Sequence, residues 1–178
     1  CGYRRKLSVL VKHLVFAAGD DVEVFSDELN HASIIDGCIL SRARVRRYAH
    51  GDVAALEAML AETSGHKLVV TDGVFSMDGD IAPLAELARV CRFHDALLVV
   101  DDAHGIGVLG PEGRGSVAEA GLSEEDVPVL IGTLGKGVGT SGAFVAGPSL
   151  LMDYLVQKAR TYIYTTAMPP ALAMATIS

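Results

Sequence analysis

The chain has 178 residues and a formal net charge of −7; half of its residues are hydrophobic and 21% are charged. This length suits one domain with a sizeable core, and the composition excludes a disordered chain. The acidic balance argues against nucleic acid or an anionic membrane surface as a partner.

Apolar runs that are typical of buried strands alternate with helical patterns along the chain. The predicted strands are 22–25, 44–48, 67–71, 96–100, 129–132 and 142–146. The predicted helices are 32–40, a helix that Asp52 caps and that runs to about 62, a helix with Pro83 in its first turn, and a helix that Pro148 opens and that ends at about 160. This alternation predicts an α/β fold with a central, parallel-rich sheet and helices on both faces.

Three cysteines, Cys1, Cys38 and Cys91, have no CxxC spacing. Neither a disulfide framework nor a metal site is expected, and a reducing cytoplasm fits. No signal peptide is recognised, and no apolar run is long enough to span a bilayer. Because the chain begins with Cys and starts and stops inside apparent elements, we expect a fragment of a longer protein. The basic run from Arg42 to Arg47 is interpreted as a solvated strand edge.

The first motif with chemical potential follows the strand 96–100. Asp101 and Asp102 come directly after this apolar run, where a strand of an α/β sheet opens into a ligand site. A carboxylate here can keep the pyridine nitrogen of pyridoxal 5'-phosphate (PLP) protonated, so that the ring accepts electrons. His104, after a turn, can reach the phenolic oxygen. The alternative is that Asp101 caps a loop and His104 packs locally.

The second motif places Lys136 among glycines after the strand 129–132. Glycine permits close backbone approach to a ligand, and a lysine of lowered pKa can form an imine with an aldehyde. Thr133 offers a hydroxyl to a phosphate. The alternative is a surface turn with a solvated lysine. A P-loop is excluded, because Leu130 and Gly137 stand where that motif needs Gly and Ser or Thr.

Two further segments carry weaker signals. In the polar loop 71–80, Ser76 can donate to the phenolic oxygen of the same cofactor or to a nearby group, while Asp78 and Asp80 around Gly79 are expected to shape a turn. Residues 105–110 match GxGxxG literally, but the dinucleotide fingerprint needs these glycines to open a helix. The proline and glycines that follow argue against a helix, and therefore against a nicotinamide or flavin site.

Taken in order, these motifs resemble the α-oxoamine synthases of the aspartate-aminotransferase fold (PLP fold type I). The resemblance extends over nearly the whole chain. The segments that carry it are 30–33, 47–50, 75–80, 101–105, 113–116, 132–136 and 168–170.

The resemblance implies a role for each matching residue. Lys136 would hold PLP as a Schiff base and then move the substrate α-proton, and Asp101 would pair with the pyridinium. His104 and Ser76 would contact the phenolic oxygen. His31 would stack on the ring and orient the acyl substrate, a role that is compatible with a cap at the start of the helix 32–40.

The phosphate would be held by Thr133 and by a loop at Gly2 and Tyr3, since backbone N–H groups at a helix start suit an anion. After Tyr3 the family has small residues and Asn, whereas this chain has Arg4, Arg5 and Lys6.

The activity implied is a decarboxylating condensation of an amino acid with an acyl thioester. The segments around Tyr48 and His104 look most like the members of biotin biosynthesis that use L-alanine with pimeloyl-CoA or pimeloyl-carrier protein. The alternatives are a member that condenses glycine with acetyl-CoA, and a cofactor-binding fragment without activity. The resemblance further implies that 1–178 is the central part of the large PLP-binding domain, without an N-terminal segment and a C-terminal small domain, and that the whole protein is a homodimer.

Overall fold

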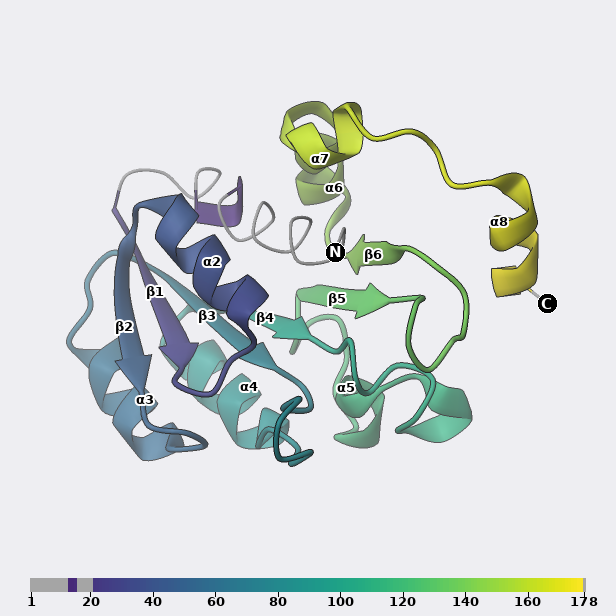
Figure 1. Cartoon of the computed structure of the whole chain (residues 1–178). Helices are drawn as coiled ribbons and strands as arrows, with labels where there is room; N and C mark the ends of the chain where they lie inside the picture. Colours follow the sequence, from purple (N-terminus) through teal and green to yellow (C-terminus); the bar gives the residue numbers. More distant parts are fainter. Residues whose placement is uncertain (1–12, 16–20, 178) are drawn as a thin grey trace.

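The computed structural model describes residues 13–15 and 21–177 (Figure 1). A six-stranded sheet in the order β2-β1-β3-β4-β5-β6 forms its centre. Five neighbouring strands are parallel, and β6 is antiparallel to β5. The strands are β1 (Val22–Asp27), β2 (Arg44–Tyr48), β3 (His66–Asp72), β4 (Ala96–Asp101), β5 (Val129–Thr133) and β6 (Ala143–Ala146).

Helices connect the strands and follow the last of them. They are α2 (Ala32–Ser41), α3 (Val53–Ala61), α4 (Leu84–Phe93), α5 (Ser116–Glu119), α6 (Ser149–Lys158), α7 (Arg160–Ile163) and α8 (Pro170–Ile177), with a short 3₁₀ turn at Pro111–Gly113. Asp52 caps α3 by accepting a hydrogen bond from the Ala55 N–H at 2.9 Å. Pro83 and Pro148 directly precede α4 and α6.

Successive residues of each inner strand pack into two separate cores, one on each face of the sheet. Phe25, Val69 and Leu98 lie in the core that contains residues of α3 and α4. Their neighbours Val24, Leu68 and Val99 lie in the core that contains residues of α2 and α6. Side chains of a strand alternate between faces, so a continuous apolar run is the pattern of a strand buried on both sides.

The predicted α/β class, the six strands and the four helices are therefore confirmed, with bounds within two residues. The extensions at the carboxyl ends bring two acidic residues into the sheet, because β3 ends at Asp72 and β4 at Asp101. The short helices α5, α7 and α8 were not predicted. One or two turns carry little periodicity, which explains why the pattern missed them.

The basic segment lies on β2, at one edge of the sheet. Arg44 pairs with Glu23 and Arg46 with Glu62, each at 2.9 Å, and the Arg44 side chain is 72% exposed. The interpretation as a solvated strand edge is confirmed. In the described part of the chain, none of the helices has the length and apolar character needed to cross a membrane.

Candidate active site

Two buried carboxylates stand side by side at the carboxyl edge of the sheet. Asp72 and Asp101 are the last residues of neighbouring parallel strands and are register partners. They are 3% and 2% exposed. Carboxyl ends of parallel strands are where α/β sheets bind ligands. This pair therefore marks the position of the candidate site.

Lys136 lies in the turn after β5, with its side-chain nitrogen 2.7 Å from Nε2 of His104. Lys136 is exposed as a residue, but partial burial of its side chain lowers its pKa, and the charges of Asp101 and Asp72 act in the opposite direction. The pKa of His104 is also lowered, chiefly by burial and then by the charges of Lys136 and His31. The structure thus brings together the lysine of the segment 132–136 with the histidine and the carboxylate of the segment 101–105.

His31 joins the site through the start of α2. Its ring nitrogen Nδ1 accepts a hydrogen bond from the Ser33 N–H at 3.2 Å and lies 2.6 Å from the Ser33 hydroxyl oxygen. The predicted helix cap is therefore confirmed. The His31 backbone N–H donates to the Asp72 carboxylate at 2.6 Å. The ring is consequently held at the same sheet edge as Lys136.

Sequence reasoning gave no role to Asp72, which is a central residue of this site. The pKa of Asp72 is raised to about 7, chiefly by burial and then by the charge of Asp101, while the His31 N–H and Lys136 act in the opposite direction. The signal was available, because Asp72 closes an apolar strand just as Asp101 does. It was instead interpreted as the beginning of a loop.

Asn30 was also without a predicted role, although it fastens the His31 segment to the sheet. Its side-chain oxygen accepts a hydrogen bond from the Asp72 N–H at 2.9 Å. Its amide group donates to the Val70 carbonyl at 2.8 Å and to the Ser26 hydroxyl at 2.9 Å. Asn30 is 4% exposed, so these three bonds are shielded from water.

The remaining predicted cofactor residues have different surroundings. Thr133 is buried at the end of β5, where its hydroxyl donates to the Gly142 carbonyl at 3.0 Å and accepts from the Gly135 N–H at 3.3 Å. Ser76 is exposed in the turn after β3. Gly2 and Tyr3 lie outside the described residues.

The turn that carries Ser76 is attached to the first two strands through His50. The two ring nitrogens of His50 lie 3.1 Å from the Asp27 carboxylate and 2.7 Å from the Asp80 carboxylate. The Gly79 N–H donates to the Phe75 carbonyl at 2.9 Å, so the acids around Gly79 do shape a turn, as predicted. In addition to shaping this turn, Asp80 is an ion-pair partner of His50.

The literal GxGxxG segment does not open a helix. Residues 105–110 form turns, and Ile106 forms an isolated bridge with Arg114. The geometry agrees with the argument against a dinucleotide site.

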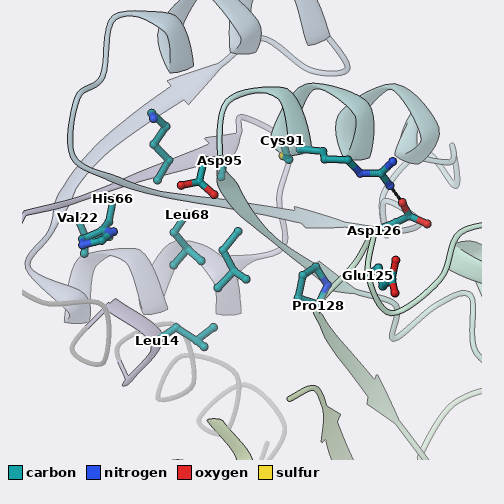
Figure 2. A pocket seen from close by; sticks show the side chains of 13 residues that line it. Leu14, Val22, His66, Leu68, Cys91, Asp95, Glu125, Asp126 and Pro128 are labelled. Atoms are coloured by element: carbon teal, nitrogen blue, oxygen red, sulfur yellow. Dashed lines mark ion pairs between the residues drawn. The ribbon is translucent and has the colours of Figure 1, made fainter. Parts of the chain in front are cut away.

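A pocket of about 400 Å³ lies at the other end of the sheet (Figure 2). Its lining includes Val22, His66 and Ala96, which are the first residues of β1, β3 and β4. Figure 2 shows Leu14 on one side of it and Asp126, an ion-pair partner of Arg92, on another. Because ligands of parallel sheets bind at the carboxyl ends, this pocket is not the candidate site.

The residues at the carboxyl edge fit a cofactor with an aldehyde and a basic ring nitrogen. Lys136 is an amine of lowered pKa, and the buried Asp101 is an acid that a protonated ring nitrogen would neutralise. His31 and His104 supply an aromatic face and a hydrogen-bonding group beside them. PLP has this chemistry.

Comparison with known proteins agrees with this interpretation. A relative from Marinobacter nauticus with the name 8-amino-7-oxononanoate synthase is 87% identical over 159 residues, which are 89% of this chain and 40% of that protein. A serine palmitoyltransferase from S. paucimobilis, solved with a bound PLP-myriocin aldimine, has a TM-score of 0.86 and 38% identity, covering 99% of this chain and 44% of that one. The 8-amino-7-oxononanoate synthase from Francisella tularensis has a TM-score of 0.81 and 36% identity, covering 96% and 49%.

The chain thus spans less than half the length of the relatives it matches. The resemblance to the α-oxoamine synthases that the motifs predicted is confirmed. The family described as aminotransferase class I and II matches residues 8–178. Fold, strand-edge residues and relatives agree, and the chain belongs to the aminotransferase class I and II family.

Proposed function

We propose that the protein containing this chain is a PLP-dependent 8-amino-7-oxononanoate synthase. It would condense L-alanine with pimeloyl-CoA or pimeloyl-carrier protein, releasing CO2 and the free thiol, in biotin biosynthesis. The observation that carries the proposal is the Lys136 amine, 2.7 Å from His104 and within the electrostatic influence of the buried Asp101. An amine in this setting is suited both to bind an aldehyde and to transfer a proton.

PLP would supply a ring that accepts electrons from a carbanion at the substrate α-carbon. Lys136 would hold the cofactor and later move the α-proton, because its lowered pKa keeps more of the amine neutral at a given pH. Asp101 would keep the ring nitrogen protonated, and His104 would hydrogen-bond the phenolic oxygen. His31 would cover the ring face and orient the acyl substrate from the start of α2.

Three predicted contacts complete the proposed cofactor site. Ser76 would donate to the phenolic oxygen, Thr133 would contact the phosphate, and Gly2 and Tyr3 would close the phosphate loop. The Asp72 carboxylate would stabilise the position of His31 by accepting a hydrogen bond from the His31 backbone N–H.

The choice of alanine and a pimeloyl thioester is supported by sequence identity. The backbone of this chain matches a serine palmitoyltransferase slightly better than an 8-amino-7-oxononanoate synthase, with TM-scores of 0.86 and 0.81. Backbone similarity reports the shared fold, and function resides in the site that is built on it. An identity of 87% to a protein named 8-amino-7-oxononanoate synthase therefore outweighs the difference in TM-score.

The proposal extends to a homodimer in the cytoplasm. Large apolar side chains are exposed on the C-terminal helices, among them Leu150, Tyr162 and Ile177. Apolar surface of this kind is usually covered by further protein. We propose that this surface is covered by the rest of the whole protein, which corresponds to the part of the relatives that this chain does not span, and by a second subunit.

The test is an assay of free-thiol release by the full-length protein loaded with PLP. We expect turnover with L-alanine and pimeloyl-CoA that exceeds the rates with glycine plus acetyl-CoA and with serine plus palmitoyl-CoA. Fastest turnover with glycine would instead identify a 2-amino-3-ketobutyrate CoA ligase. Borohydride reduction followed by peptide mapping should place the cofactor on Lys136, and a tag on another lysine would overturn the assignment. The same reduction on residues 1–178 alone would show whether this part binds the cofactor without turnover.

A further inference from the structure

Asp102 is a buried carboxylate that the proposed reaction does not use. It is 0% exposed. One oxygen accepts a hydrogen bond from the Ser116 N–H at 2.8 Å, and the other accepts from the Ser116 hydroxyl at 2.7 Å. These two bonds join positions that are 14 residues apart, so Asp102 closes the loop 103–115 at its base.

Three glycines lie so close to this carboxylate that a side chain at any of their positions would not fit. A Cβ atom at Gly73, Gly105 or Gly115 would collide with the oxygens of Asp102. Burial raises the pKa of Asp102, while the Ser116 hydrogen bonds act in the opposite direction. A carboxylate that is enclosed and bonded in this way holds the loop in one position.

The loop that Asp102 closes packs on the turn that carries Lys136. A Cβ atom at Gly137 would lie 2.5 Å from the Ile106 carbonyl oxygen. A Cβ atom at Gly107 would lie 2.8 Å from the carbonyl carbon of Gly137. Backbone therefore meets backbone here, one residue from the reactive lysine, and only glycine permits the approach. The literal GxGxxG segment thus has a packing role.

Hydrogen bonds within the loop connect its base, which Asp102 holds, to the contact between Gly107 and Gly137. The Gly107 N–H donates to the Gly113 carbonyl, and the Gly115 N–H donates to the Leu109 carbonyl, both at 2.8 Å. His104 lies on the same loop, two residues after Asp102. Both members of the Lys136–His104 pair consequently depend on the loop.

We propose that Asp102 is a positioning residue for Lys136, acting through the loop 103–115 and the backbone contact between Gly107 and Gly137. The inference rests on the proposed function only in taking Lys136 as the reactive amine. It adds that an acid outside the cofactor site sets where this amine points.

The test compares Gly107→Ala with Gly121→Ala in the full-length protein. Both glycines have a positive φ, +81° and +68°, so both substitutions strain the backbone. A Cβ atom at Gly121 meets nothing within 4 Å, whereas one at Gly107 meets the Gly137 backbone. The difference between the variants therefore isolates the contact.

The first measurement is amide hydrogen exchange of residues 134–140 without cofactor. We expect exchange to be faster by about tenfold or more in Gly107→Ala, because local opening becomes easier, and unchanged in Gly121→Ala. The second is borohydride trapping of PLP on Lys136. Misplacement by about 1 Å can reduce such a reaction by about a hundredfold, and we expect a loss of that order in Gly107→Ala only. Asp102→Ala should reproduce both effects.

Equal exchange and equal trapping in the two glycine variants would overturn the proposal. So would a general loss of folding in Gly107→Ala alone, since the contact would then support the whole fold instead of the lysine. The exchange measurement needs neither cofactor nor substrate. A failure of the proposed function would therefore show in the wild-type assays, and a failure of this inference in the comparison of the variants.

Discussion

The side-chain nitrogen of Lys136 lies 2.7 Å from Nε2 of His104, although the two residues are 32 positions apart in the chain. At this distance, only one of the two nitrogens can point a proton at the other. When Lys136 is charged it donates to a neutral His104, and after burial the charge of Lys136 is the next cause of the lowered pKa of His104. Their pairing links the loop after β4 to the turn after β5 at the carboxyl edge of the sheet.

Replacing Lys136 tests the central assignment. We expect Lys136→Ala to abolish trapping of PLP by borohydride and to reduce turnover by at least about 10²- to 10⁴-fold, the usual contribution of a positioned acid or base. Lys158→Ala, on an exposed residue at the end of α6, is the matched control and should behave as wild type. Trapping that persists in Lys136→Ala would contradict the assignment.

The carboxylate of Asp72 should control the pH at which Lys136 becomes reactive. Its charge favours the ammonium form, so Asp72→Asn should lower the pKa of Lys136 further. Modification of Lys136 by a neutral aldehyde would then reach its plateau at a lower pH than in wild type. Because the pKa of Asp72 is raised to about 7, the difference between the proteins should appear above that pH.

The measurement is the rate of Lys136 modification against pH, followed by peptide mass. Asp78→Asn, in the exposed turn after β3, is the control with the same change of charge. Identical midpoints for Asp72→Asn and Asp78→Asn would show that Asp72 does not act on the lysine.

Asp72 should also reduce the stability of the cofactor-free protein at high pH. Between pH 3.8 and about 7 the folded state keeps a proton on Asp72 that the unfolded state has lost. Folding stability therefore falls as pH rises through this window and stays low above it, by at most roughly 4 kcal/mol. Asp72→Asn removes this loss, so it should unfold at a higher temperature than wild type at pH 8.5 but not at pH 4.5. A stability difference that is the same at both pH values would refute this account.

Asn30 should matter for stability more than its position in a connecting segment suggests. Asn30→Ala leaves the Asp72 N–H and the Val70 carbonyl without their buried partner, at about 1–3 kcal/mol for each unsatisfied group. Urea unfolding should show this loss. Ser123→Ala, which removes an exposed hydroxyl bonded to Asp126, should lose much less. Similar losses in the two variants would mean that the Asn30 bonds contribute little.

Much of the fold could be predicted because its strands are buried on both faces. Such strands are continuous apolar runs, and the helices between them begin at recognisable residues such as Asp52. The position of Lys136 among glycines and of Asp101 after an apolar run likewise placed both residues at the carboxyl ends of strands, where the structure has them. Each of these signals is local, so one sequence was sufficient to find it.

The contacts between distant segments could not be predicted in the same way. Asp72 and Asp101 are adjacent only because β3 and β4 pair in a particular register, and a shift by one residue would have moved one carboxylate to the other face. Asn30, Asp102 and the glycines beside Lys136 gain their roles from neighbours 14 to 42 positions away or on another loop. Roles of this kind depend on hydrogen bonds and close backbone contacts between distant segments. The order of residue types along the chain does not specify these contacts.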